Sequence, residues 1–383
     1  TKIVFYCIMV LKRFNSTRNP NKAMNKKESG NKNVTIKDVA EKAGVAVSTA
    51  SMALNNKPTI SSDTKQIVLK VAKDLGYHPT AAARALVDGK SSNLGLLVPV
   101  KVDSLFFSTG FFQKLIAGMN RAANESGNLI SLQIVESRDE TKRVVTEAYR
   151  TKNVSGSIIT HPTQEMPYLD VIEEFNYPVV FLGESPRDFP YVDNDNYGVA
   201  KLATEHMIEH GYKRIAFLGG PEELIASEAR ERGYRAALEQ KDIEVQAKLI
   251  WRSRHDERMA YREVMSKASN SDFSAICISV EEQMAGVYRA LRDLGKSVPE
   301  DVALITIGDS QLAEHMNPSM TALDLHTEKL GYLAAKKLNR LINGEVENDD
   351  NIVKADLIRR KSCGCNADSG GDRSELTVRN RSV

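Results

Sequence analysis

A cluster of hydroxyl side chains follows a glycine in the stretch VTIKDVAEKAGVAVSTASMALNN, from Val34 to Asn56. Small apolar residues recur there at helical spacing, and Gly44 interrupts them where a chain reversal needs a positive φ. A second helix would turn outward the side chains of Ser48, Thr49, Ser51 and Met52. Two short helices joined by a glycine turn form a helix-turn-helix, whose second helix enters a major groove. The chemistry expected of this cluster is therefore DNA recognition, with an ordinary pair of packed helices as the alternative.

Apolar stripes define the helices that would carry this surface. The two stripes are Val39, Ala40 and Ala43, then Val47, Ala50 and Leu54. Thr35 could cap the first helix, and a third helix is predicted over Ser62–Leu75, ended by Gly76 and stopped by Pro79. This unit of about 45 residues is small for a stable domain. The alanine-rich segment Thr80–Asp88 is a short helix that we expect to fold only when docked.

Charge is distributed unevenly along the 383 residues. The first 90 residues hold sixteen Lys or Arg and six Asp or Glu, a net +10, so the remainder carries −8 of the total +2. A basic head on an acidic body indicates that only the head touches a polyanion. A solvated face is the alternative explanation of a charge run, but here the basic part coincides with the helix-turn-helix.

Cysteine usage and hydropathy limit the compartment and the chemistry. The four cysteines are Cys7, Cys277, Cys363 and Cys365. They form no disulfide framework, which indicates a reducing compartment and a cytoplasmic location. Cys363-Gly364-Cys365 lacks the CxxC spacing of a zinc site and has no His or Cys cluster near it in sequence, so we interpret it as incidental, with redox or metal chemistry as the alternative. The apolar run Ile3–Leu11 is too short to span a bilayer and is a poor signal peptide, so no membrane partner is expected.

From Asn93 onward, short apolar runs alternate with amphipathic helical patterns. The runs cover 94–100, 129–135, 156–160, 179–183, 214–220, 275–279 and 302–308, and the helical patterns include Phe112–Glu125, Tyr197–His210, Ser227–Glu239 and Glu281–Leu294. This alternation is typical of parallel sheets covered on both faces and predicts an α/β fold with two doubly wound lobes and a ligand cleft between them. No GxGxxG, GxxxxGK[ST] or GxSxG motif occurs, so no cofactor, catalytic residue or metal ligand is predicted.

Together these features resemble the lactose-repressor (LacI/GalR) family of bacterial transcription regulators, over about residues 34–364. The matching stretches are VTIKDVAEKAGV, Ile60-Ser61, LGYHP (75–79), ARAL (83–86), VDNDNYG (192–198), HMIEHGYKRIAFLGGP (206–221), SEARERGYRAAL (227–238), NPSMTAL (317–323) and RRKSCGC (359–365). The resemblance implies a three-helix helix-turn-helix headpiece (34–79), a hinge helix and linker (80–92) and a two-lobed core of periplasmic-binding-protein type (93–365). It implies a homodimeric repressor on a pseudo-palindromic double-stranded DNA operator, with a small-molecule effector. The polar composition of the segments outside the resemblance predicts disordered tails at 1–33, which is basic, and at 366–383.

The resemblance also implies roles for headpiece residues. Hydroxyl and amide groups stand where the family contacts phosphates, at Thr35, Thr49, Ser51, Asn55 and Thr64. Val47, Ser48 and Met52 stand where members read base edges. Leu86 matches the hinge leucine that wedges into the minor groove, with a linker contact as the alternative. Two departures are Ala46, where a capping serine is common, and Met52, where many members carry an arginine that binds guanine.

In the cleft the departures are larger. Arg230 matches the arginine that commonly binds a ligand in the family, with a lobe-to-lobe salt bridge as the alternative. Gly308, which precedes Asp309, replaces a ligand-binding Asp of the family, and Val280-Glu281 replaces an Asn-Asp pair. Two groups that usually bind sugar or nucleoside hydroxyls are thus absent. We take Asp309, Glu184 and His255 as the remaining candidate ligand contacts, while a surface position is an equal alternative for His255.

Two interpretations of the cleft stay open. Either the effector is neither a typical sugar nor a purine, or the cleft has lost its ligand and the regulator is effector-independent or controlled by a protein partner. Two other classes of protein are less favoured. A solute-binding protein would share the core, but the basic headpiece and the lack of an export signal argue against it, and no motif supports an enzyme.

Overall fold

The computed structural model describes residues 34–54, 57–77, 91, 93–99, 110–185, 187–345 and 351–365. The chain divides into two compact units, Thr1–Thr80 and Ala81–Val383. The predicted tails 1–33 and 366–383, Asn55 and the hinge segment with Leu86 lie outside the described residues. Within the described ranges, no helix is long and apolar enough to cross a membrane.

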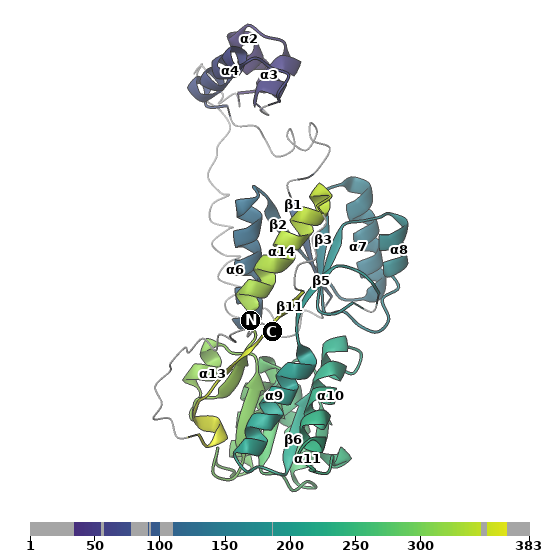
Figure 1. Ribbon diagram of the computed structural model, residues 1–383, viewed down its shortest axis with the longest axis vertical. Helices are drawn as coiled ribbons and strands as arrows, with labels where there is room; N and C mark the ends of the chain where they lie inside the picture. Colours follow the sequence, from purple (N-terminus) through teal and green to yellow (C-terminus); the bar gives the residue numbers. More distant parts are fainter. Residues whose placement is uncertain are drawn as a thin grey trace, which may run out of the picture. The chain divides into compact units, whose positions relative to one another are not determined.

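The described residues of the first unit form three helices, α2 (Ile36–Ala43), α3 (Val47–Leu54) and α4 (Ser62–Leu75) (Figure 1). Thr35 is the N-cap of α2, as predicted, and its backbone N–H donates to the Asp38 carboxylate at 2.7 Å. Gly44 and Gly76 end α2 and α4 with φ values of 66° and 65°, in the left-handed region that favours glycine. The three predicted helices, the Thr35 cap and the ends at Gly44 and Gly76 are thus confirmed, while Pro79 lies outside the described residues.

Small side chains let these helices pack closely. The most deeply buried are Val39, Ala40, Ala50, Ala53 and Val68. The predicted stripe on α3 was partly wrong, because Ala53 lies in the core whereas Val47 is 43% exposed. Val47 is the first residue of α3, where α2 and α4 cover it less than they cover the residues one turn further on. The exposure of Val47 agrees instead with its predicted place on the outer surface.

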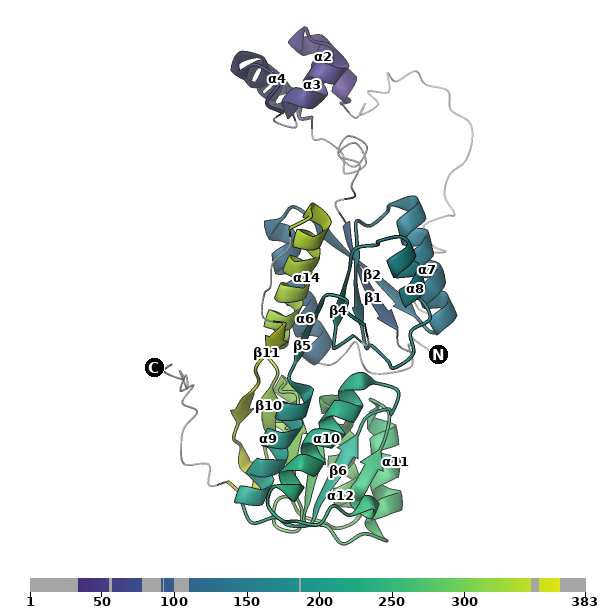
Figure 2. The ribbon, with the colours of Figure 1, turned by 45° about the vertical axis from the view of Figure 1, so that its right-hand side comes forward.

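The second unit begins with a parallel sheet of strand order β11-β5-β4-β3-β1-β2. Its strands are β1 (Asn93–Pro99), β2 (Leu129–Val135), β3 (Ser157–Thr160), β4 (Val179–Leu182), β5 (Tyr191–Asn194) and β11 (Ile352–Val353). Helices α6 (Gly110–Glu125) and α14 (Thr327–Asn343) lie side by side on one face, and α7 (Arg138–Thr151) and α8 (Leu169–Glu174) on the other (Figures 1 and 2). A Cβ atom at Gly118 of α6 would overlap the backbone of α14, so glycine permits this close crossing.

A second sheet, of strand order β12-β10-β9-β8-β6-β7, forms the second lobe and is parallel except for β12. Its strands are β6 (Ile215–Gly219), β7 (Ile250–Arg252), β8 (Ala275–Ile278), β9 (Ala303–Ile307), β10 (Thr321–Asp324) and β12 (Asp356–Ile358). The helices are α9 (Asn196–Glu209), α10 (Ile225–Glu239), α11 (Glu257–Ala268), α12 (Met284–Asp293) and α13 (Gln311–His315), with 3-10 turns η2 (Ala247–Leu249), η3 (Glu281–Gln283) and η4 (Lys361–Cys363). The predicted α/β fold with two doubly wound lobes is confirmed.

Among the described residues, three chain segments connect the lobes: β5 to α9, β10 to α14, and β11 to β12. The side-chain amide of Asn194, at the end of β5, donates to the backbone oxygens of Leu325 at 3.0 Å and Val353 at 2.7 Å. The buried side chain of Asn194 thus joins the three connecting segments by hydrogen bonds where they pass between the lobes.

Strand β2 departs from the predicted burial of the apolar runs. It lies at the edge of the first sheet, and the side chains of Leu129 and Leu132 are 60% and 41% exposed. An apolar edge strand is a surface that a second chain can cover.

Candidate DNA interface and effector cavity

Helix α3 presents the surface predicted to read DNA. Val47 and Ser48 are exposed, and Thr49, Ser51 and Met52 are half-buried. Ala46 precedes the helix, and its carbonyl accepts the first helical bond, from the Ala50 N–H at 2.9 Å. Alanine has no side-chain oxygen that could cap the first turn, so the N–H groups at the start of α3 keep their donor capacity for another acceptor, such as a phosphate.

Two of the predicted phosphate contacts have partners within the headpiece. The Thr35 hydroxyl donates to the Asp38 carboxylate at 2.7 Å. Thr64, in the first turn of α4, has its hydroxyl 2.9 Å from that of the N-cap Ser61, and its N–H donates to the Ser61 oxygen at 3.3 Å. Thr64 is therefore held at a helix start, where backbone N–H groups favour anions.

A cavity of about 110 Å³ lies between the two lobes. Much of its lining comes from residues at or just after the ends of parallel strands, as the rule for doubly wound sheets predicts, and helices α6, α10 and α14 add Phe111, Arg230 and Leu330. Ligand pockets for drug-sized molecules measure about 300–1,000 Å³, so this cavity is small.

Hydrogen bonds between the lobes close the cavity. The Phe111 N–H at the start of α6 donates to the Glu281 carboxylate at 3.1 Å, and Lys114 donates to the carbonyl of Asp309 at 2.9 Å. On another side, the Gln164 amide donates to the Glu228 carboxylate at 2.7 Å. The structure therefore represents a closed core, and a larger ligand would require these bonds to open.

Arg230 projects from α10 to the cavity. Its Nε donates to the Asn196 side-chain oxygen at 2.8 Å and its Nη1 to the Ser279 carbonyl at 2.6 Å. Both hydrogen-bond partners belong to the second lobe, whereas the Asp193 carboxylate of the first lobe acts on the guanidinium as a nearby charge, so the lobe-to-lobe alternative keeps an electrostatic basis. Burial lowers the pKa of the guanidinium, an effect that the nearby Asp193 and Glu282 carboxylates oppose, and arginine stays charged.

Asp193, next to the last residue of strand β5, supplies the opposite charge. Its carboxylate accepts the backbone N–H groups of Asn194 at 2.7 Å and Glu184 at 3.1 Å, and the Asn196 side-chain amide at 2.8 Å. Burial raises the pKa of Asp193 to about 6, although these hydrogen bonds and Arg230 favour the ionised form. The cavity thus combines a donor fork with an acceptor carboxylate.

Two neutral imidazoles complete the polar lining. Burial lowers the pKa of His161 to about 4 and that of His255 to about 3, and their ring centroids lie 6.3 Å apart. His161 follows β3 with a left-handed φ of 56°, a strained conformation that clusters at ligand sites. The Nε2 atom of His255 is buried and has no hydrogen-bond partner among the described residues. A buried polar atom without a partner is expected where a ligand supplies one.

The structure separates the predicted ligand contacts into two groups. Arg230 and His255 line the cavity, and the buried Nε2 atom of His255 favours the predicted ligand contact over a surface position. Glu184 and Asp309 do not line it. The Glu184 side chain is exposed, and the Asp309 carboxylate forms an ion pair with Arg360 at 2.7 Å, which already satisfies its charge.

Sequence reasoning missed the contacts offered by His161, Asp193 and Asn196, all of which line the cavity. Each ends or closely follows a strand of the first sheet, so the carboxyl-end rule applied strand by strand was the available signal. The two positions at which a polar ligand contact was predicted to be absent, Val280 and Gly308, do line the cavity, and neither has a polar side chain.

Comparison with known proteins covers both units. Residues 35–80 match the bacterial regulatory proteins of the lacI family, and residues 204–363 match a periplasmic binding protein-like domain. The chain is 30% identical to the HTH-type transcriptional regulator MalR of Streptococcus pneumoniae serotype 4, over 86% of this chain and 98% of MalR.

Solved structures agree with this assignment. A transcriptional regulator CelR–cellobiose complex is 29% identical with a TM-score of 0.66, over 86% of this chain and 99% of that one. A lac repressor dimer bound to operator and the anti-inducer ONPF is 22% identical with a TM-score of 0.74, over 87% and 99% of the two chains, which shows the shared fold. The helix-turn-helix match and the regulator relatives exclude the enzyme and solute-binding alternatives. The chain belongs to the lacI family of bacterial regulatory proteins and is a DNA-binding transcriptional regulator.

Proposed function

We propose that this regulator binds a pseudo-palindromic operator as a homodimer in the cytoplasm and that a small, hydroxyl-rich effector sets its affinity for DNA. The effector part rests on one observation: Arg230, Asp193 and His255, whose buried Nε2 has no hydrogen-bond partner among the described residues, line the same cavity. A hydroxyl group both donates and accepts, so it can pair with the guanidinium, the carboxylate and the imidazole together.

The size of the cavity limits the effector. A volume of about 110 Å³ suits a small polyol or organic hydroxy compound in the closed core. The similar regulator CelR has been solved with cellobiose, a larger ligand. In this chain a disaccharide would have to separate Phe111 from Glu281 and Gln164 from Glu228. We therefore place the effector among molecules smaller than a disaccharide.

In the headpiece, Val47, Ser48 and Met52 would read base edges, while Thr35, Thr49, Ser51, Asn55 and Thr64 would contact phosphates. This assignment is supported by the exposure of α3 and by the helix-start positions of Thr35 and Thr64. Leu86 would enter the minor groove at the centre of the operator. The exposed edge strand β2, with Leu129 and Leu132, is the surface that we assign to dimer contact.

Effector control would act through the closed and open forms of the core. A ligand that binds one form better shifts the population toward it. The bonds from Phe111 and Lys114 to the second lobe exist only when the lobes are together. The first lobe joins the hinge segment, so its movement in a dimer would change the spacing of the two headpieces.

The second candidate is a regulator whose cleft has lost its ligand. The observation that favours it is the apolar lining at Val280 and Gly308, where the family carries polar ligand contacts. Such a protein would bind its operator constitutively or respond to a protein partner.

Thermal unfolding of the full chain against polyols, monosaccharides, disaccharides, nucleobases and organic acids tests the proposal. A ligand at 100 times its Kd stabilises by about 2.7 kcal/mol, which gives a measurable shift. We expect a hit among small hydroxylated compounds, and the same compound should change the affinity for a selected operator duplex. If no compound shifts the transition while operator binding is intact, the cleft without a ligand is the correct description.

Met52→Arg is expected to move operator preference toward G·C at one position of each half-site, by about 1–3 kcal/mol, because arginine can contact guanine O6 and N7 together. Selection from a random duplex library, followed by sequencing, measures the preference. Gln66→Arg, which adds the same charge at an exposed position of α4, is the matched control and should leave the preference unchanged. Identical preferences for Met52→Arg and the wild type would rule out base reading at this position.

A further inference from the structure

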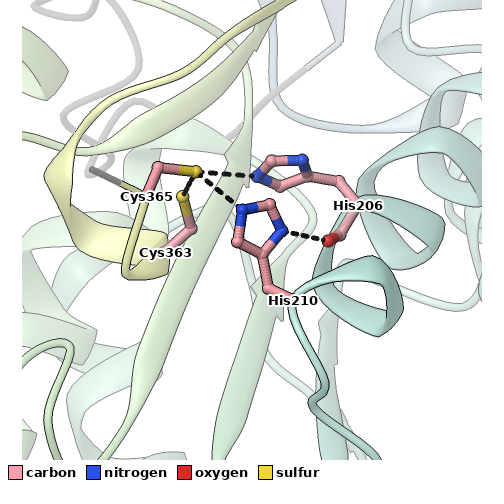
Figure 3. Close-up of side chains that lie close together, drawn as sticks. All are labelled: His206, His210, Cys363 and Cys365. Atoms are coloured by element: carbon pink, nitrogen blue, oxygen red, sulfur yellow. Dashed lines mark hydrogen bonds between the residues drawn. The ribbon is translucent and has the colours of Figure 1, made fainter. Parts of the chain in front are cut away.

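Four potential metal ligands meet on the second lobe (Figure 3). They are His206 in the last turn of α9, His210 at its C-cap, Cys363 in η4 and Cys365 two residues later. One ligand atom from each residue lies within 4.8 Å of all the others. None of the four lines the effector cavity.

The histidines are arranged as metal ligands on one helix face. Their spacing of four residues stacks the two rings, whose centroids lie 4.3 Å apart. The Nδ1 atom of His210 lies 2.8 Å from the His206 carbonyl, which only accepts, so the ring proton is on Nδ1. The lone pair of Nε2 therefore faces the Cys365 sulfur at 3.0 Å, as in metal-bound histidines whose other nitrogen donates to a carbonyl.

The cysteines converge because the chain turns at Gly364, whose φ of 80° is in the left-handed region. Both thiols are free, with their sulfurs 2.6 Å apart, and the Cys365 sulfur also lies 3.7 Å from His206 Nε2. Thr321 Oγ1 lies 3.1 Å from the Cys363 sulfur and 3.0 Å from the Arg360 carbonyl, so its one proton can be donated to either acceptor. A hydroxyl donor of this kind supports a thiolate.

We propose that His206, His210, Cys363 and Cys365 bind one zinc ion in a tetrahedral Cys2His2 site. Zinc bonds of about 2.3 Å to sulfur and 2.0 Å to nitrogen place ligand atoms about 3.3–3.8 Å apart, so the sulfurs must separate by about 1 Å. Both thiols lose their protons on binding, so each zinc ion releases two protons and the site becomes neutral overall.

The ion would fasten the end of the described chain to α9. Cys363 is fully buried in the core cluster that contains Met207 of α9, and the Tyr212 hydroxyl donates to the Cys363 carbonyl at 3.3 Å. The ligand pairs are about 155 residues apart in sequence, and a crosslink that closes a long loop restricts the unfolded chain strongly. The site therefore has a structural role, and zinc should raise the Tm of the core.

Metal content of the untagged full chain, purified with a non-thiol reductant, tests the site. We expect one zinc ion per chain, two protons released when zinc is added to metal-free protein, and a lower Tm after chelation. Cobalt(II) in place of zinc should give thiolate charge-transfer bands and the visible bands of a tetrahedral ion.

His210→Ala is the informative variant, because His210 is exposed and its loss should not disturb the core. It should weaken zinc binding roughly 100-fold or more, and Cys365→Ser should do the same. His315→Ala is the matched control, since His315 is also exposed at the end of a helix with Nδ1 bonded to the carbonyl four residues earlier. Zinc absent from the reduced wild type, no tetrahedral cobalt spectrum, or equal zinc affinity in wild type and His210→Ala would each overturn the proposal. None of these outcomes bears on effector or operator binding.

Discussion

Replacing Arg230 by alanine is expected to lower the free energy of unfolding of the core by about 3 kcal/mol and to abolish the effector response. The change removes donors from Asn196 and from the Ser279 carbonyl, and it leaves the Asp193 carboxylate without its cationic neighbour. Removing one partner of a buried charge pair is costly because the other charge stays desolvated. Urea unfolding measures the first effect, and the thermal shift with the identified effector measures the second.

The loss of unfolding free energy in Arg230→Ala should also depend on pH, which adds a second measurement to the same test. The pKa of Asp193 is raised to about 6 in the folded protein, whereas it is near 4 in the unfolded chain. The folded protein therefore holds this proton more tightly. The stabilisation from the protonated carboxyl is fully present below about pH 4 and is lost as the pH rises through about 6. Without Arg230 the folded pKa rises further, so the ionised carboxylate destabilises the variant more. The difference in unfolding free energy between wild type and Arg230→Ala should therefore be larger at pH 8 than at pH 5.

A double-mutant cycle with Asp193→Asn separates the charge pair from other effects of the arginine. We expect Arg230→Ala to be less damaging in the Asp193→Asn background, because the carboxylate is no longer present. Arg121→Ala is the control arginine, since Arg121 forms an exposed ion pair with Glu328 and should change stability by less than about 1 kcal/mol. If Arg230→Ala bound the effector as well as the wild type does, the proposal that the effector binds in this cavity would be wrong.

The secondary structure was largely predictable, because buried strands and amphipathic helices each leave a pattern of apolar residues along the sequence. The run 129–135 and the helix Ser62–Leu75 coincide with β2 and α4 as observed. The same signature does not say where a strand lies in its sheet, so the exposure of β2 came only from the structure. Short strands such as β11 and β12 are two or three residues long and carry too few apolar positions to show a pattern.

The candidate sites depended more on long-range contacts. Arg230 was predictable from a motif, but the pairing of Asp309 with Arg360 joins residues 51 apart in sequence, and no local pattern encodes it. The absence of a nearby His or Cys in the sequence made Cys363 and Cys365 look incidental. In the structure, α9 brings His206 and His210 to these cysteines across about 155 residues.

Ala50→Leu is expected to abolish operator binding while the second unit keeps its fold. Ala50 is fully buried between the headpiece helices, beside Val39 and Val68, and the larger side chain has no space there. Overpacking a core typically costs 1–3 kcal/mol, or about the whole stability of a unit of this size. In thermal unfolding, we expect the transition of the headpiece to be weakened and the later transition of the second unit to be unchanged.

The effect on DNA binding should exceed the effect on folding, because a dimer needs two folded headpieces for one operator. The apparent affinity falls with the square of the folded fraction, so headpieces that are only one-tenth folded would weaken binding on the order of 100-fold. Ala46→Leu adds the same side chain at an exposed N-cap position, where alanine and leucine cap equally poorly, so its headpiece should stay folded. Because the effector cavity lies wholly in the second unit, effector-induced stabilisation should survive in Ala50→Leu. Loss of both responses together would mean that the two units do not fold independently, and the headpiece would then owe its stability to the core.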